Sequence, residues 1–123
     1  MAKSILIVDD SPTVLALVKA TLEKVGYEVE TAIDGEQCLE KAKDTPPDLI
    51  LLDVEMPNMD GYTTLRELKY GDKSTKNIPV VMLTSKGRLE DIFFLEGATD
   101  FIEKSQAAYQ LLPQKISTVL GDA

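Results

Sequence analysis

The chain has 123 residues and a net charge of −8, with 21 acidic against 13 basic side chains, no histidine and a single cysteine, Cys38. This length fits one domain over residues 1–123, and the acidic balance argues against a direct nucleic-acid surface, which needs a basic patch. No apolar stretch is long enough to span a membrane, Ser-His and Cys-His catalysis are excluded, and an unpaired cysteine without a signal peptide predicts a cytoplasmic location.

Strand-like and helix-like segments alternate along the chain. Short apolar runs bounded by turn residues predict buried strands, and apolar residues at helical spacing predict helices. The predicted elements are, in chain order, strand 5–8, helix 12–25, strand 27–32, helix 36–43, strand 49–53, helix 61–69, strand 78–83, helix 89–96, strand 99–103 and helix 106–120. Five strand-helix repeats predict an α/β fold in which a parallel sheet carries helices on both faces.

Two residues receive a structural interpretation. Asp60 stands directly before Gly61, where it is most simply the cap of the helix that follows. Cys38 shares a helical face with Leu39 and Ala42, which predicts a small core residue rather than a reactive thiol.

Polar side chains end four of the predicted strands: Asp9 with Asp10, then Asp53, Thr84 and Lys104. The carboxyl ends of parallel strands meet at one edge of the sheet, where ligands bind in open α/β folds. Three carboxylates there repel one another unless a cation lies among them, and Mg²⁺ prefers oxygen ligands. Alone, each residue would more simply be a cap, a turn residue or a solvated charge. Together they predict a magnesium site beside Asp53, a nucleophile that can hold a phosphoryl group, with Lys104 supplying a charge and Thr84 a hydroxyl.

Four segments carry a resemblance to a known family, residues 5–11, 48–61, 79–85 and 97–104. Together they resemble the receiver domain of bacterial two-component response regulators, over essentially the whole chain. The resemblance implies a flavodoxin-like, doubly wound sheet of strand order 2-1-3-4-5, and a phosphoacceptor rather than an enzyme. The implied partners are a sensor histidine kinase or phosphotransfer domain, a downstream protein target or output domain, and a second copy of the chain after phosphorylation.

The resemblance also implies how the phosphoacceptor works. Asp53 would take a phosphoryl group from a phosphohistidine of the kinase. Magnesium would be held by Asp9, Asp10, Asp53 and the backbone carbonyl of Glu55.

Switching is implied by the same resemblance. Thr84 would bond the phosphoryl group and move inward, Phe101 would follow as an aromatic switch, and Lys104 would pair with a phosphoryl oxygen. The first helix would dock the kinase, and the last strand with the two helices beside it would carry the output.

The sequence departs from the family pattern in two places. Ser105 follows Lys104 where the family usually has proline, and the stretch between Thr84 and Gly97 is shorter than usual. A cis bond before serine costs about 2.5–4 kcal/mol, against about 0.5–1 before proline, so a trans bond is predicted here. Both departures bear on the output face and leave the phosphorylation site untouched.

Two further charges flank the predicted site. Glu55 and Lys86 lie two residues beyond Asp53 and Thr84, and we expect them to gate the lifetime of the phosphorylated state. Two independently solvated charges explain the same positions equally well.

Two other classes of function stay open on the residues alone. An aspartate-nucleophile phosphatase of the haloacid dehalogenase type would carry its nucleophile on the first strand in an Asp-x-Asp arrangement, whereas Asp9 and Asp10 are adjacent. A pseudo-receiver that binds partners constitutively is the second, and the complete set of site residues argues against it.

Overall fold

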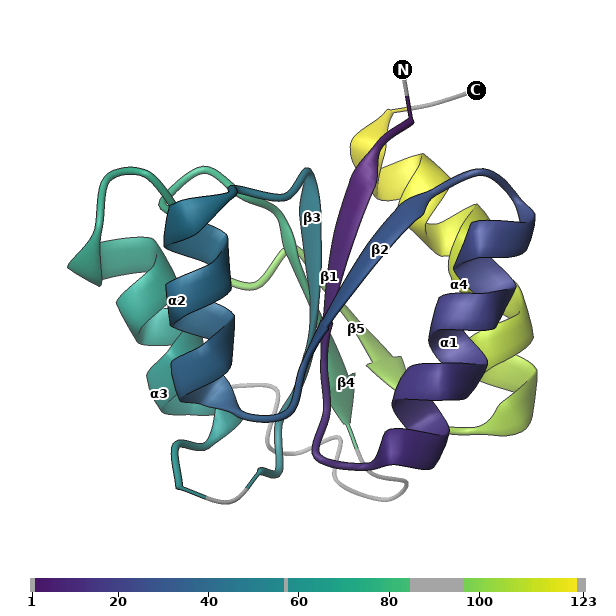
Figure 1. The fold of residues 1–123 in the computed structure, drawn as a ribbon, viewed down its shortest axis with the longest axis horizontal. Coiled ribbons are helices and arrows are strands. Elements are labelled where there is room, and N and C mark those ends of the chain that lie inside the picture. The colour runs from purple at the N-terminus through teal and green to yellow at the C-terminus, as the bar shows by residue number, and fades with distance from the viewer. Residues whose placement is uncertain (1, 57, 85–96, 122–123) are drawn as a thin grey trace.

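Five parallel strands form the centre of the computed structural model, which describes residues 2–56, 58–84 and 97–121 (Figure 1). The strands are β1 (Ser4–Val8), β2 (Glu28–Ala32), β3 (Leu49–Asp53), β4 (Val80–Thr84) and β5 (Asp100–Glu103). They pair in the order β2-β1-β3-β4-β5, and every pairing is parallel. The predicted doubly wound fold and its 2-1-3-4-5 order are confirmed.

Helices cover both faces of this sheet. They are α1 (Pro12–Lys24), α2 (Gly35–Asp44), α3 (Gly61–Arg66), continued by the π-helical turn η1 (Glu67–Gly71), and α4 (Gln106–Leu120). Figure 1 shows α1 and α4 on one side of the sheet and α2 and α3 on the other. The predicted helix 89–96 lies outside the described residues. Within the described part of the chain, no helix has both the length and the apolar character needed to cross a bilayer.

The sheet separates two apolar clusters. Successive side chains of a strand point to opposite faces, so β1 sends Ile5 and Ile7 to the side of α1 and α4, and Leu6 and Val8 to the side of α2 and α3. Every residue of β3 is buried, as expected for a central strand of a parallel sheet. The strand ends are therefore fixed by packing on both faces.

Strand β2 forms one edge of the sheet, where Glu28 and Glu30 are exposed, Val29 and Thr31 are half-buried and Ala32 is buried. Glu28 and Glu30 lie on the face that α2 leaves partly open. The Lys41 ammonium of α2 donates to the Thr31 carbonyl and lies 3.4 Å from Glu30 Oε2, which ties the helix to this edge. The edge position of β2 agrees with the implied strand order 2-1-3-4-5.

Side-chain caps begin the helices where the sequence indicated. Ser11 Oγ accepts a hydrogen bond from the Val14 amide at 3.3 Å, and Asp60 Oδ1 accepts one from the Thr63 amide at 2.8 Å. The interpretation of Asp60 as a cap is confirmed. Cys38 is fully buried, and burial raises the pKa of its thiol to about 12, so it is a core residue as predicted.

The third helix differs from its prediction. A regular α-helix over residues 61–69 was expected, but the α-helix ends at Arg66 and the chain continues as η1. The Lys69 ammonium donates to the carbonyls of Lys76 and Ile78, and the Thr75 hydroxyl donates to the Leu68 carbonyl at 2.7 Å. These contacts with the following loop favour the wider turn, and periodicity in the sequence does not reveal them.

Gly61 approaches the backbone beneath the end of β3. A Cβ atom at this position would lie 2.5 Å from the Asp53 carbonyl oxygen and 2.6 Å from Val54 Cα, and neither backbone atom can rotate away. We expect Gly61→Ala to lower the free energy of unfolding by about 1–3 kcal/mol, measured by urea denaturation. Gly71→Ala is the matched control, because its Cβ would meet only the flexible Glu67 carboxylate. Equal stability of the two variants would contradict this account.

Candidate functional site

Four strand ends bring the predicted site residues together at one edge of the sheet. Asp9 directly follows β1, Asp53 ends β3, Thr84 ends β4, and Lys104 directly follows β5. Backbone hydrogen bonds extend the sheet up to these residues: the Asp9 amide donates to the Ala32 carbonyl at 3.1 Å, and the Lys104 amide to the Thr84 carbonyl at 2.7 Å. The convergence predicted from the parallel sheet is thus observed.

The Lys104 ammonium bridges two carboxylates at the centre of this edge. Its Nζ lies 2.8 Å from Asp9 Oδ2 and 2.9 Å from Asp53 Oδ2. Asp9 and Asp53 are almost fully buried, at 0% and 1% exposure. Buried carboxylates need such a partner, because removing an unpaired charge from water is costly.

Backbone amides hold the other oxygen of each carboxylate. Asp9 Oδ1 accepts the Ser11 amide at 2.9 Å, and Asp53 Oδ1 accepts the Glu55 amide at 3.1 Å. Each carboxylate is therefore oriented by its own local turn as well as by Lys104.

Asp10 completes an acidic cluster. One carboxylate oxygen from each of Asp9, Asp10 and Asp53 lies within 4.8 Å of the others, and Asp10 is exposed. Ligand oxygens around Mg²⁺, at about 2.0–2.1 Å from the metal, lie about 3–4 Å apart. The cluster therefore fits magnesium in donor type and nearly in spacing. The part assigned to the Glu55 carbonyl stays a prediction.

Burial opposes the charge on Asp53. It raises the pKa of this carboxyl from 3.8 to about 6, helped by the Asp9 charge and opposed by the hydrogen bond and charge of Lys104 and by the Glu55 amide. For Lys104, burial lowers the pKa, but the two carboxylates outweigh it and leave the pKa above its ordinary value. The raised pKa keeps the Lys104 ammonium charged, and this charge maintains the bridge.

Thr84 is buried with an unused hydroxyl. Its side chain is 1% exposed, and its Oγ1 has no hydrogen-bond partner among the described residues. A buried polar group without a partner is costly and calls for an explanation. Phe101 of β5 is half-buried and packs against the core cluster on the side of α2 and α3.

The expected gating pair, Glu55 and Lys86, is described only in part. Glu55 is exposed, and its amide rather than its carboxylate is seen to contact Asp53. Lys86 lies outside the described residues, as does the whole stretch of residues 85–96. No peptide bond among the described residues is cis, so the predicted trans bond between Lys104 and Ser105 is confirmed.

Tyr109 lies on the buried face of α4 with Leu112 and Ile116, and it was not among the predicted site residues. Burial raises the pKa of its hydroxyl; the Lys104 charge acts to lower it, and the Asp9 and Asp53 charges act to raise it.

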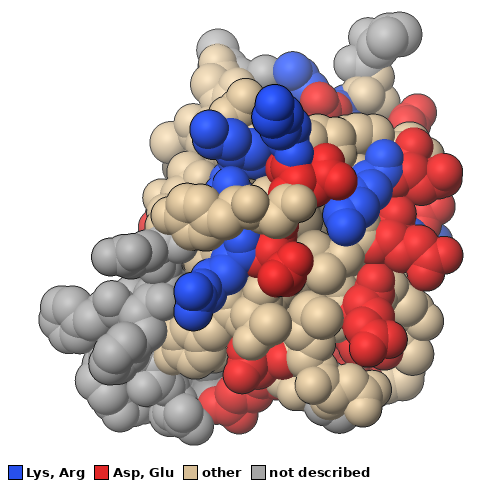
Figure 2. Space-filling model, turned by 90° about the vertical axis from the view of Figure 1, so that its left-hand side faces the viewer, with Lys and Arg blue, Asp and Glu red and all other residues tan. Residues whose placement is uncertain are grey.

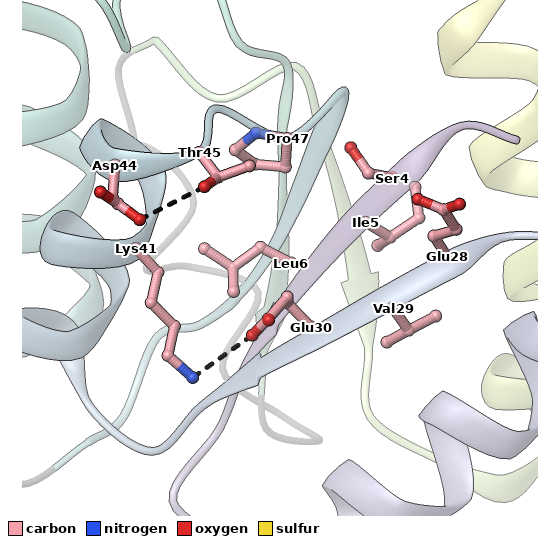
Figure 3. Close-up of a pocket in the computed structure, with 10 residues that line it drawn as sticks. All are labelled: Ser4, Ile5, Leu6, Glu28, Val29, Glu30, Lys41, Asp44, Thr45 and Pro47. Atoms are coloured by element: carbon pink, nitrogen blue, oxygen red, sulfur yellow. Dashed lines mark hydrogen bonds and ion pairs between the residues drawn. The ribbon is translucent and has the colours of Figure 1, made fainter. Parts of the chain in front are cut away.

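A hollow lies away from this edge of the sheet, between α2 and the first residues of β1 and β2 (Figure 3). Its volume is about 540 Å³. Its lining residues are Ser4, Ile5, Leu6, Glu28, Val29, Glu30, Lys41, Asp44, Thr45 and Pro47. Figure 3 shows Lys41 turned toward Glu30 across the hollow. The Lys41 ammonium is therefore already engaged in its ion pair with Glu30. None of the predicted site residues lines it.

The profile of the response regulator receiver domain family matches residues 5–116. The chain belongs to this family. This membership removes the haloacid dehalogenase alternative and confirms the resemblance seen in the sequence. The acidic cluster of Asp9, Asp10 and Asp53 at the strand ends is consistent with this membership.

Curated relatives of this receiver domain are longer proteins. It is 48% identical over 106 residues to the response regulator PleD of Caulobacter vibrioides, covering 85% of this chain and 23% of PleD. It is 42% identical over 102 residues to the transcriptional regulator RpaA of Synechocystis, covering 81% of this chain and 42% of RpaA. The chain thus spans less than half of the length of these two relatives.

Solved receiver structures superpose over nearly the whole chain. The chemotaxis protein CheY4 of Vibrio cholerae is 34% identical, with a TM-score of 0.87 over 97% of this chain and 99% of that one. The N-terminal domain of a response regulator receiver protein from Methanoculleus marisnigri is 41% identical, with a TM-score of 0.77 over all of both chains.

The raised pKa of Asp53 predicts a pH-dependent cost to stability. Because the folded-state pKa of about 6 exceeds the ordinary 3.8, the folded state binds more protons between these values, and stability falls as the pH rises through them. Asp53→Asn removes this cost while Lys104 keeps Asp9. We expect the free energy of unfolding of the variant at pH 7 to exceed that of the parent chain by about 1–3 kcal/mol.

Urea denaturation with a chelator present measures the difference. It should shrink as the pH falls from 7 towards 4, because Asp53 takes up its proton in the folded state near pH 6 and in the unfolded state only near 3.8. A difference that stays constant over this range would contradict the assigned pKa.

Proposed function

We propose that Asp53 accepts a phosphoryl group from a phosphohistidine of a sensor histidine kinase or phosphotransfer domain. An Asp53 carboxylate oxygen attacks phosphorus and forms the new O–P bond as the P–N bond breaks. The departing imidazole nitrogen takes the electron pair of that bond. The product is an aspartyl phosphate on this chain, and the proposal makes it a phosphoacceptor rather than an enzyme with a substrate of its own.

The bridge between Lys104, Asp9 and Asp53 is the observation that carries this proposal. It places an ammonium 2.9 Å from the acceptor carboxylate, where negative charge must gather on the phosphoryl oxygens. Asp53 is positioned by the fully buried β3 and by the Glu55 amide, so the nucleophile arrives oriented. Attack requires one Asp53 oxygen to exchange its present partner for phosphorus.

Asp9, Asp10 and Asp53, with the Glu55 carbonyl, would hold magnesium beside the acceptor. When bound, Mg²⁺ neutralises charge on the phosphoryl oxygens and on the clustered carboxylates. Asp10 is the exposed member of the cluster and stays free of the Lys104 bridge, which suits it to a ligand role.

Thr84 supports a switching role. Its buried, unpartnered hydroxyl is available to donate to a phosphoryl oxygen, which would satisfy it and draw it toward Asp53. Phe101 on the neighbouring strand would follow this movement, since β4 and β5 pair directly. Glu55, and Lys86 beyond the described residues, are proposed to gate attack by water on the aspartyl phosphate.

The proposed output face is formed by β5, α4 and the predicted helix 89–96, which lies outside the described residues. A hollow of about 460 Å³ lies there, with the exposed Leu111 and the 2.8 Å ion pair of Lys115 with Asp100 in its lining. Phe101 also lines it, so movement of this ring would change its shape. The partner would be an output domain, a downstream protein or a second copy of the chain.

Docking of the kinase is assigned to α1, and the chain as a whole is taken as one cytoplasmic receiver domain.

The face over α2 and α3 mixes basic and acidic side chains (Figure 2). Together with a net charge of −8, this favours protein partners over direct binding of nucleic acid.

Acetyl phosphate with Mg²⁺ should add one phosphoryl group to the chain, detected by mass spectrometry of the intact protein. Asp53→Asn should abolish the adduct, because an amide is a poor nucleophile and Asp53 is the carboxylate that ends the central strand β3, between the acidic pair and Lys104. Asp44→Asn, at an exposed helix end, should leave it unchanged. Hydroxylamine should remove the adduct, as it cleaves acyl phosphates. A full adduct on Asp53→Asn would refute the assignment.

Asp10→Ala should remove the magnesium dependence of phosphorylation without unfolding the protein, because Asp10 is exposed. We expect adduct formation to become slow and nearly independent of Mg²⁺ concentration, while circular dichroism matches the parent chain. An unchanged magnesium titration would exclude Asp10 from the site.

A further inference from the structure

Ser11 is the residue that joins the acidic cluster to the first helix. Its amide donates to Asp9 Oδ1 at 2.9 Å, its hydroxyl accepts the Val14 amide at 3.3 Å, and its carbonyl accepts the Leu15 amide at 3.0 Å. One residue therefore holds both the Asp9 carboxylate and the first turn of α1.

The hydrogen bond between Asp9 and Ser11 closes a turn around Asp10. Asp10 lies between the two bonded residues in the sequence and is the exposed member of the acidic cluster. A bond from an aspartate side chain to the amide two residues on is a common way of fixing a tight turn. The directions of both carboxylates, and with them the spacing of the cluster, depend on this turn staying closed.

The Asp9 carboxylate has one further contact of this kind. Its Oδ2 lies 2.8 Å from the Lys104 ammonium, while Oδ1 faces the Ser11 amide. Two contacts on opposite oxygens give the carboxylate one orientation. If the Ser11 amide moved away, the carboxylate could pivot about Lys104 alone.

The backbone of Ser11 has little freedom to absorb a movement of the helix. Its φ of −92° and ψ of 113° are extended, which is the conformation that a following proline imposes. Pro12 is that proline, and it stands at the start of α1, where its fixed φ is already helical. A shift in the first turn of α1 is therefore passed on to the Ser11 amide.

We propose that Ser11 is a positioning residue that couples the first turn of α1 to the magnesium site. Its hydroxyl keeps the helical turn closed, and the closed turn keeps its amide within reach of Asp9 Oδ1. Ser11 touches neither the metal nor the phosphoryl group and acts only through Asp9 and Asp10. This role rests on the proposed magnesium site, and it gives a partner that contacts the start of α1 a means of changing the affinity of that site.

Ser11→Ala tests the role, since it removes the hydroxyl and leaves the amide. We expect the Kd of Mg²⁺ to rise about two- to tenfold, a smaller loss than is typical when a direct partner of a metal ligand is removed. Isothermal titration calorimetry with MgCl₂ and no phosphodonor measures this Kd. Ser11→Thr keeps an N-cap hydroxyl and should bind Mg²⁺ with nearly the parental Kd. A parental Kd for Ser11→Ala, or equal losses in the two variants, would overturn the proposal.

Ala20→Gly separates the contact of Ser11 from the general stability of α1. Ala20 is an exposed residue further along the same helix, and glycine there weakens the helix about as much as the loss of a cap does. This variant should keep the parental Kd for Mg²⁺. A rise as large as that of Ser11→Ala would contradict the proposal, because helix stability alone would then set the affinity.

Hydrogen exchange supplies a readout on the helix itself. Coupling is reciprocal, so Mg²⁺ must favour the closed turn by the same factor by which the closed turn favours Mg²⁺. Saturating MgCl₂ should therefore slow exchange of the Leu15 amide about two- to tenfold in the parent and leave it unchanged in Ser11→Ala. Equal slowing in both chains would refute the coupling. A parent chain that binds no Mg²⁺ would instead refute the proposed magnesium site, and this role with it.

Discussion

The contact of one ammonium with two buried carboxylates organises this molecule. Lys104 can reach Asp9 and Asp53 together only because β5, β1 and β3 run parallel and end at the same edge. The register of the sheet, set by packing on both of its faces, determines these distances. The pairing also makes the burial of two acids tolerable, since either carboxylate alone would be an isolated charge in the interior.

The site also holds polar groups in conditions that folding alone would not favour. The pKa of Asp53 is raised by burial, and the Thr84 hydroxyl lacks a partner among the described residues. Violations of this kind concentrate at functional positions, where the missing interaction is supplied by a ligand. Both would be relieved by the same event, the arrival of an oxygen-rich anion with a cation.

Much of this arrangement could be predicted from the residues. The apolar run that ends in Asp53 predicts a buried strand from its own residues. Parallel topology then brings Asp9, Thr84 and Lys104 to the same edge of the sheet. The wide turn after Arg66 could not be predicted, because it depends on contacts that Lys69 and Thr75 make with a loop several residues away.

The polar edges of the sheet have a consequence for assembly. A strand with free backbone groups can recruit a strand from another molecule and extend the sheet, which is a common route to aggregation. Glu28 and Glu30 on β2, and Asp100 and Glu103 at the ends of β5, place negative charge on both outer strands. Two copies meeting edge to edge would bring like charges together. Acidic side chains on both outer strands thus disfavour pairing of two sheets edge to edge.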